Sequence, residues 1–144
     1  MPSVLYAHLT WTTLRRESLI DASVAAFLRR FVPPQARRHG AQVLEIGILR
    51  DHVHVLLDMA PGCPVSQLVQ ALKGASARLV NRDGIVPAGR PLRWARGYDL
   101  RSVSPQALTA ACDYVRRQAA HHPLDRVEKQ PERAERLTAG AVEP

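Results

Sequence analysis

Apolar and polar side chains alternate with a period of two in several stretches of the chain. Residues 3–13 show this alternation, which predicts a strand with one buried face. Residues 41–49 and 51–57 alternate in the same way with one residue between them, so they predict a β-hairpin. A fourth strand is expected within residues 92–103, interrupted at Gly97. The apolar positions expected on one face of each of the first three strands are Leu5, Ala7, Leu9 and Trp11, then Leu44, Ile46 and Ile48, then Val53, Val55 and Leu57.

Three other segments repeat apolar side chains at helical spacing. Asp21 precedes the first and is expected to cap it, whereas the two prolines at 33–34 are expected to kink or end it. A second helix is predicted over residues 65–80. Ser104 followed by proline is typical of a helix start and predicts a third helix through about Ala120. The stripes expected to be buried in the last two helices are Leu68, Leu72, Ala75 and Leu79, then Leu108, Ala111, Cys112, Val115 and Ala119.

The predicted elements follow one another as strand, helix, strand, strand, helix, strand and helix. This order predicts an α+β protein with the ferredoxin-like split β-α-β fold, an antiparallel sheet with two helices on one face. The other face is then open for a ligand, a partner or the additional C-terminal helix, which carries Tyr114. We predict one domain over residues 1–122 and a mixed-charge tail over residues 123–144, either a short helix or disordered.

The amino-acid composition favours a polyanionic partner. The 144 residues include 20 Lys and Arg against 13 Asp and Glu, a formal net charge of +7. Residues 125–144 contain four basic and five acidic side chains, so the basic excess lies in the predicted domain. Such an excess favours nucleic acid, bound through phosphate contacts, although an arginine-rich solvated surface gives the same count.

Other classes of protein are disfavoured by the same sequence. No uncharged apolar stretch approaches the roughly 20 residues that span a bilayer, so no membrane association is expected. The first residues lack the basic start and apolar run of a secretory signal. The two cysteines are expected to be reduced thiols, and a cytoplasmic location follows from that expectation.

His52 and His54 are the first candidates for chemistry. They are two residues apart on a predicted strand, so both imidazoles project from one face, opposite Val53, and can converge on a divalent cation. A solvent-facing pair without function would have the same spacing. Tyr114 and Gln118 are four residues apart on the last predicted helix and therefore lie on one flank, at the edge of its apolar face. They are placed to reach a metal site, although packing at the core boundary is the commoner role of a helical tyrosine.

Six short motifs occur in the order in which one protein family carries them. Together they resemble the small single-tyrosine HUH transposases of bacterial insertion sequences, where HUH denotes two histidines around a bulky hydrophobic residue. The C-terminal pattern, Tyr-x-x-x-Gln-x-x-His-His, is more similar to this branch than to the related REP-associated tyrosine transposases. The six motifs are His8 to Thr13, Asp51 to Leu56, Leu72-Lys73-Gly74 with Ser76 and Arg78, Trp94 with Gly97-Tyr98, Ser102-Val103-Ser104, and Tyr114 to His122.

The resemblance implies a metal-dependent DNA enzyme. It assigns His52 and His54, with Gln118, to the binding of Mg²⁺ or Mn²⁺, and it assigns Tyr114 as the nucleophile. In this family the tyrosine cleaves single-stranded DNA at the ends of the insertion sequence, which are recognised as hairpins. The tyrosine stays linked to the 5′-phosphate, and attack on that link by another DNA end rejoins the strands.

Further roles and alternatives remain open from the sequence. The family builds its site across a homodimer, in which the tyrosine helix can come from the other subunit. Asp51 and Glu45 are candidates for orienting the imidazoles, and Tyr98 is the rival nucleophile. A non-catalytic nucleic-acid-binding module of the same fold is one alternative, and an HUH nickase or replication initiator is another. The candidate DNA-binding residues are Lys73, Arg78, Arg116, Arg117 and His121.

Overall fold

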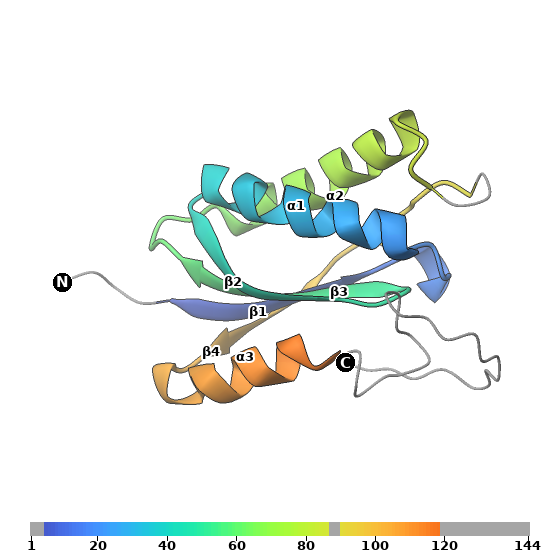
Figure 1. Ribbon diagram of the computed structural model, residues 1–144. Helices are drawn as coiled ribbons and strands as arrows, with labels where there is room; N and C mark the ends of the chain where they lie inside the picture. The colour runs from blue at the N-terminus through green and yellow to red at the C-terminus, as the bar shows by residue number, and fades with distance from the viewer. Residues whose placement is uncertain (1–4, 87–89, 119–144) are drawn as a thin grey trace.

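The computed structural model describes residues 5–86 and 90–118 of the chain. It confirms the predicted order of strands and helices (Figure 1). The elements are β1 (Tyr6–Thr12), α1 (Ala22–Arg38), β2 (Ala41–Ile48), β3 (His52–Met59), α2 (Val65–Arg82), β4 (Asp99–Val103) and α3 (Leu108–Arg116).

The four strands form one antiparallel sheet in the order β2-β3-β1-β4. This topology is the predicted split β-α-β arrangement, in which each helix of the repeat crosses from one strand to another over the same face. Helices α1 and α2 cover one face of the sheet, and α3 lies against the other face (Figure 1). The predicted fold class is therefore confirmed, and the last helix occupies part of the face that the sequence left open.

The apolar core lies between the sheet and the helices α1 and α2. Burial alternates along β1, as its period of two predicts, so that Leu9 and Trp11 face the core. Full burial of a side chain of this size contributes roughly 1.5–3 kcal/mol to stability. The predicted inward positions of β3 are confirmed, and its partners from the two helices are Val24, Leu28, Val32, Leu68 and Leu72.

Helix α1 begins as predicted but does not end at its prolines. The Asp21 carboxylate accepts a hydrogen bond of 3.0 Å from the Val24 N–H, which is the expected N-cap. The helix then continues through both prolines at 33–34 to Arg38, so of the two predicted outcomes, a kink or an end, the end does not occur. Each proline costs about 3 kcal/mol in a helix interior. Burial of apolar residues on either side, Val32 and Ala36, offsets this cost.

Strand β2 contains an irregularity that the alternating pattern hides. Its register against β3 shifts between Val43 and Glu45, which corresponds to a β-bulge. Because of this shift, Val43 packs against the core together with Ile46, and the predicted inward position of Leu44 is wrong. The bulge also turns Glu45 toward α3, where the carboxylate meets Arg116.

Helix α2 differs from its prediction in the face that it buries, and strand β4 differs in where it begins. The stripe of α2 is rotated, because Ser76 and Val80 are buried in place of Ala75 and Leu79. Strand β4 begins only at Asp99, two residues after Gly97, whose φ of +81° is a left-handed conformation that favours glycine.

The start of the last helix follows the predicted cap. The Ser104 hydroxyl accepts from the Ala107 N–H at 3.2 Å, and a short 3₁₀ turn leads into α3, which runs to Arg116. The predicted end near Ala120 lies outside the described residues. Only Val115 of its predicted stripe is fully buried. Predictions for Ala119, His121 and the tail fall outside the described residues.

Two expectations about environment can be compared with the described residues. Cys63 and Cys112 are free thiols, as predicted. Within the described ranges, no helix has both the length and the apolar character needed to cross a membrane.

Candidate functional site

The two histidines lie on the sheet face that carries α3. Residues 52 and 54 of β3 alternate with the core residue Val53, so their imidazoles project away from α1 and α2. This confirms the predicted face. His52 is 3% exposed and His54 is 1% exposed, so a solvent-facing pair is excluded. The ring centroids of the two histidines lie 4.9 Å apart.

A carboxylate fixes the orientation of His52. Asp51 precedes β3 directly, and its Oδ1 lies 2.7 Å from Nδ1 of His52. Its other oxygen accepts from Nε of Arg16 at 3.3 Å. Burial acts to raise the pKa of Asp51, but the hydrogen bond and charge of His52, with those of Arg16, outweigh it and the net pKa is lowered. Asp51 therefore stays ionised and accepts the proton at Nδ1, so Nε2 is the basic nitrogen of this ring.

His54 is held by two residues of β1. The register places Thr10 directly opposite His54. Nδ1 of His54 lies 2.9 Å from Nε2 of His8 and 3.3 Å from the Thr10 hydroxyl. Burial lowers the pKa of His8, opposed by the charge of Asp99, and this favours its neutral form as a hydrogen-bond partner.

The sequence analysis did not assign His8 to the site. The alternation in residues 3–13 already placed His8 on the face opposite Leu9. The local pattern does not give the register between β1 and β3, which brings His8 next to His54, 46 positions away in the sequence. Strand pairing over such a separation cannot be read from a local pattern.

Tyr114 and Gln118 come to the histidines from α3. The ring centroid of Tyr114 lies 6.1 Å from that of His8 and 6.2 Å from that of His54. Tyr114 is 39% exposed, so its ring borders solvent. Gln118 is 1% exposed, and its Nε2 donates to the Tyr114 carbonyl at 3.3 Å. Its Oε1 has no hydrogen-bond partner among the described residues. The structure therefore brings together the four residues predicted to form the catalytic and metal site.

A glycine allows α3 to come this close to the sheet. Gly47 lies opposite His54 in the β2–β3 ladder and faces α3. A β carbon at this position would lie 2.5 Å from the Val115 carbonyl oxygen and 3.5 Å from the Gln118 β carbon. An exposed ion pair at 3.0 Å between Arg116 and Glu45 adds a second tie between α3 and β2. Glu45 thus contacts Arg116, and its role in orienting an imidazole stays a prediction.

The donor set fits a divalent cation. Because Nδ1 of each histidine contacts another residue, Nε2 is the nitrogen that would hold a metal, and the buried Gln118 amide oxygen requires a partner. Two imidazoles and an oxygen suit cations of intermediate softness and leave positions for phosphate and water. Within residues 5–86 and 90–118, no group of three or more His, Cys, Asp and Glu side chains is arranged to hold a metal. The predicted metal ligands are His52, His54 and Gln118, so only two of them are of those types and they do not form such a group.

Comparison with known proteins places this arrangement in a family. A family model described as IS200-like transposase matches residues 2–118. The chain belongs to this transposase family. Among curated proteins, the ISDra2 transposase TnpA of Deinococcus radiodurans is 37% identical over 71 residues. That alignment covers 49% of this chain and 51% of the relative, so the chain spans about half the length of the curated relative it matches.

Two solved structures resemble this IS200-like transposase in fold. A crystal structure of a proposed transposase from Deinococcus radiodurans R1 has a TM-score of 0.64 and 27% identity, covering 82% of this chain and 93% of that chain. A REP-associated tyrosine transposase bound to a REP hairpin has a TM-score of 0.62, covering 85% of this chain and 70% of that chain. Its identity is 12%, so this second likeness concerns the fold alone.

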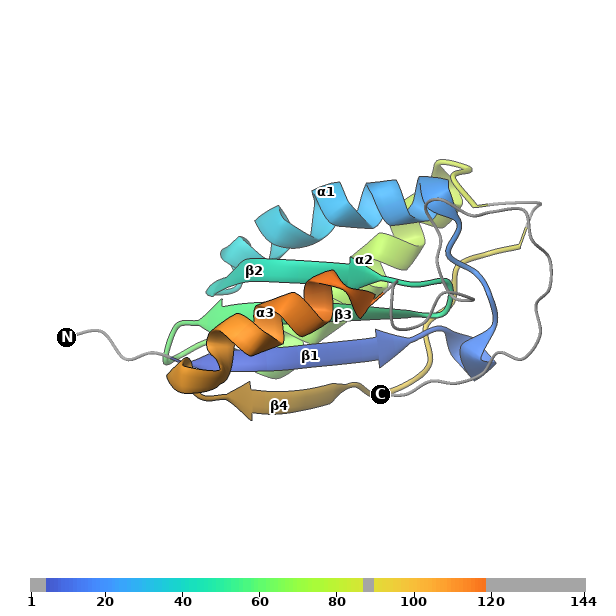
Figure 2. The same ribbon diagram turned by 60° about the horizontal axis from the view of Figure 1, so that its bottom comes forward.

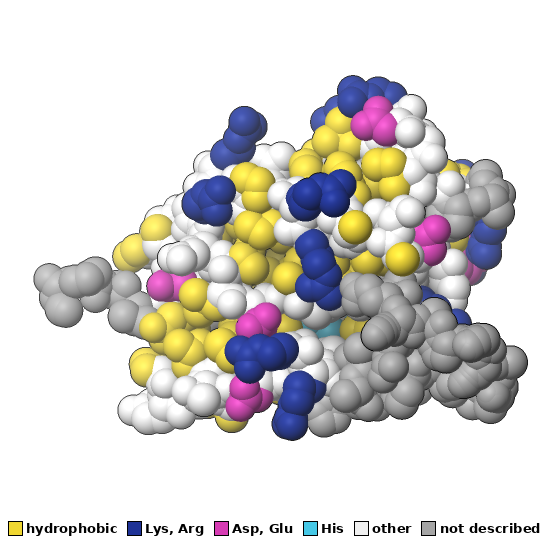
Figure 3. Space-filling view, in the orientation of Figure 1, with side chains coloured by type: hydrophobic (Ala, Val, Ile, Leu, Met, Phe, Trp, Pro, Cys, Tyr) yellow, Lys and Arg dark blue, Asp and Glu magenta, His cyan; other side chains and the backbone are white. Residues whose placement is uncertain are grey.

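The predicted DNA-binding residues of the IS200-like transposase lie in different places. Lys73 and Arg78 belong to α2, on the opposite side of the sheet from α3 (Figure 1). Nζ of Lys73 donates to the carbonyls of Ala95 and Gly97 at 2.7 and 2.8 Å, and burial lowers its pKa. Arg117, an exposed residue, follows α3 directly. Figure 3 likewise shows Lys and Arg side chains spread over several elements of one face rather than gathered in one patch.

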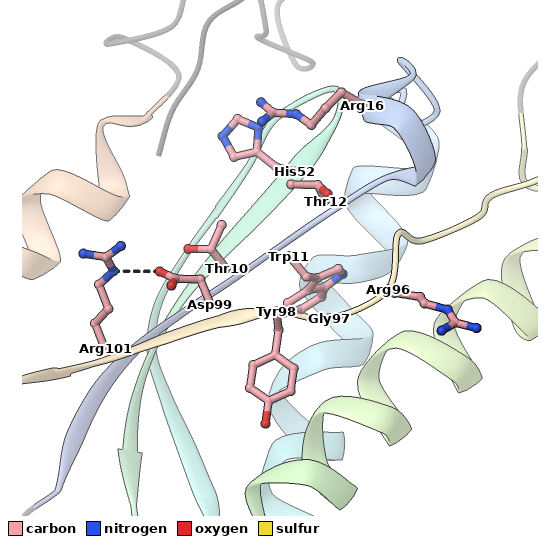
Figure 4. Close-up of a pocket in the computed structure, with 10 residues that line it drawn as sticks. All are labelled: Thr10, Trp11, Thr12, Arg16, His52, Arg96, Gly97, Tyr98, Asp99 and Arg101. Atoms are coloured by element: carbon pink, nitrogen blue, oxygen red, sulfur yellow. Dashed lines mark hydrogen bonds and ion pairs between the residues drawn. The ribbon is translucent and has the colours of Figure 1, made fainter.

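A pocket of about 300 Å³ lies beside His52. It is lined by residues from β1, β4 and the segment before β4, including Arg96 and Arg101, and by Arg16 from the 3₁₀ turn after β1 (Figure 4). Tyr98, the rival nucleophile, also lines this pocket, but its ring points away from His52 (Figure 4). This orientation favours Tyr114 as the nucleophile.

Proposed function

We propose that this transposase cleaves and rejoins single-stranded DNA through a covalent tyrosine intermediate. The observation that carries the proposal is the 6.2 Å between the ring centroids of Tyr114 and His54, on a sheet face where His52 and Gln118 are also buried. A buried imidazole pair, a buried amide oxygen and a partly exposed phenol together are not explained by packing alone.

The chemistry assigned to the protein is a transesterification. The Tyr114 oxygen attacks a phosphodiester, forms a bond to phosphorus and expels the 3′ oxygen of the upstream strand, which leaves with a proton as a 3′-OH. The downstream strand keeps its 5′-phosphate as a tyrosyl ester. A second 3′-OH then attacks that ester and forms a bond to phosphorus, while the bond to the Tyr114 oxygen breaks and the phenol regains its proton. The strands are thus rejoined without an external energy source.

His52, His54 and Gln118 are proposed to hold Mg²⁺ or Mn²⁺. When bound, the cation supplies charge stabilisation and orientation of the scissile phosphate. Asp51 and His8 keep the two imidazoles in the required tautomer and orientation through their contacts at Nδ1.

The proposed substrate is the hairpin-bearing single strand at the ends of an insertion sequence. One structural neighbour, the REP-associated tyrosine transposase, is bound to a REP hairpin, which supports this substrate class. We also propose a homodimer acting in the cytoplasm. The family resemblance supports the dimer, and the two free thiols support the location.

The test incubates the full chain with a labelled single-stranded hairpin oligonucleotide and Mn²⁺ or Mg²⁺. We expect a labelled protein band that survives denaturation, together with a free 3′-OH fragment. The same mixture with EDTA should give neither product. Binding without a covalent product, in the presence of metal, would contradict the proposal and support the non-catalytic module. Cleavage without rejoining would support a nickase or replication initiator.

A prediction concerns the role of Asp51 in metal binding. Asp51→Asn replaces the carboxylate that fixes His52 with an amide of the same size, so Mn²⁺ affinity should fall roughly 10- to 100-fold. Titration calorimetry without DNA measures this directly. Asp83→Asn is the matched control, because Asp83 is an exposed carboxylate at the end of α2 that also pairs with an arginine, Arg82, at 2.9 Å. Equal Mn²⁺ affinities for Asp51→Asn and the parent protein would contradict the orienting role.

A further inference from the structure

We infer that the pocket beside His52 is the subsite for one nucleotide of single-stranded DNA next to the scissile phosphate. The inference rests on the proposed function, because it takes Tyr114 and His52 as the reacting centre. It adds a substrate-binding role for Arg16 and Arg101, two of the arginines that line this pocket.

The pocket occupies the half of the sheet face that α3 leaves uncovered. Helix α3 packs on β2 and β3. In Figure 2 it crosses the sheet obliquely toward these two strands and does not cover the C-terminal end of β1 or the start of β4. The pocket lies at those ends of β1 and β4 and includes His52. A strand bound there therefore reaches the histidines without displacing α3.

The pocket is lined by basic and hydrogen-bonding groups along β1. Arg101 of β4 lies opposite His8 of β1, and His52 of β3 lies opposite Thr12 of β1. Along β1, the two positions are therefore four residues apart. Four residues of a strand span roughly 13 Å. Arg16 lies at the His52 end of this stretch, close to the imidazole (Figure 4). Guanidinium groups at both ends suit a backbone with regularly spaced phosphates.

Neutral and acidic groups between the arginines suit a base or a sugar. Thr10 and Thr12 contribute polar side chains on this face, and Asp99 is held by Arg101 at 2.8 Å. Hydroxyl and carboxylate groups hydrogen-bond the edges of unpaired bases and sugars. A pocket of about 300 Å³ accepts a small group such as one nucleotide. A base pair in a duplex would first have to be opened to enter it.

The segment before β4 is held in place by buried contacts. Lys73 binds the carbonyls of Ala95 and Gly97, and the Trp94 indole donates to the Ser76 hydroxyl at 3.1 Å. These contacts give Lys73 a positioning role for the wall of the pocket, in place of the direct DNA contact predicted from its charge.

The test compares two arginine variants of the full chain in EDTA, so that binding is measured without chemistry. The probes are fluorescein-labelled dT12 and the duplex of dT12 with dA12, and anisotropy gives Kd over a series of NaCl concentrations. Arg101→Gln should weaken dT12 binding about fivefold or more and reduce the slope of log Kd against log salt by about 0.7. Its effect on the duplex should be smaller.

Arg82→Gln is the matched control. Arg82 is exposed at the end of α2 and pairs with Asp83 at 2.9 Å, much as Arg101 pairs with Asp99. It should change the Kd for dT12 less than twofold. Equal losses in both variants, or an equal loss for duplex and single strand, would overturn the subsite.

Two further results separate this inference from the proposed function. Arg101-dependent binding without any covalent adduct would reject the proposed chemistry and retain the nucleotide site. If the parent protein forms the adduct but Arg101→Gln leaves the Kd for dT12 unchanged, the subsite alone would be overturned.

Discussion

Tyr114→Phe should abolish the covalent DNA adduct and lower the cleavage rate by at least about 10³-fold. The substitution removes the attacking oxygen and keeps the ring that packs near His8 and His54. The thermal midpoint should therefore change little. The measurement is the yield of labelled protein after denaturation, over a time course with Mn²⁺ and a single-stranded hairpin oligonucleotide.

Tyr98→Phe is the matched control for this prediction. Tyr98 is 42% exposed, close to the exposure of Tyr114, and it loses the same hydroxyl group. Because its ring points away from His52, the variant should still form the adduct (Figure 4). An adduct that persists in Tyr114→Phe and disappears in Tyr98→Phe would show that the nucleophile has been assigned to the wrong tyrosine.

A mixing experiment tells which subunit supplies the tyrosine. In one chain Tyr114 already lies beside the histidines of that chain. We therefore expect that Tyr114→Phe protein mixed with His54→Ala protein stays inactive. Restored activity in the mixture would show that the tyrosine acts on the histidines of a partner subunit, as the family resemblance allows.

The parts of the site that could be predicted are those set by local periodicity. The spacing of His52 and His54 fixes a common face for two imidazoles on a strand, and Ser104 fixes the start of the helix that carries Tyr114. What brings these elements together is non-local. The pairing of β1 with β3, which brings His8 to His54, depends on the whole sheet.

Two other features of the structure could not be predicted from the local pattern of apolar and polar residues. The bulge after Val43 shifts the phase of β2, so the continuous alternation predicted the wrong face for Leu44. Lys73 looked like a DNA contact because it is basic and lies outside the apolar stripe. Its actual partners are backbone carbonyls, which carry no signature in the sequence.

Gly47→Ala should reduce adduct formation about 100-fold while the protein still folds. The added β carbon would meet the Val115 carbonyl oxygen at 2.5 Å, so α3 must move away from the sheet. A displacement of this kind misplaces Tyr114 and Gln118 together, and an error of about 1 Å at a reacting group costs about 10²-fold in rate. The steric cost in folding free energy should be about 1–3 kcal/mol. Adduct time courses and urea unfolding measure the two effects.

Gly74→Ala separates this steric effect from the general effect of replacing glycine. Gly74 lies inside α2, and a β carbon there would have no atom within 4 Å. This variant should be more stable by about 0.5–1 kcal/mol and fully active, because alanine favours the helix and touches nothing at the site. Since α1 and α2 form the main core without α3, Gly47→Ala should keep the sheet and lose activity. Full activity in a folded Gly47→Ala protein would mean that close packing of α3 on β2 is not what positions the tyrosine.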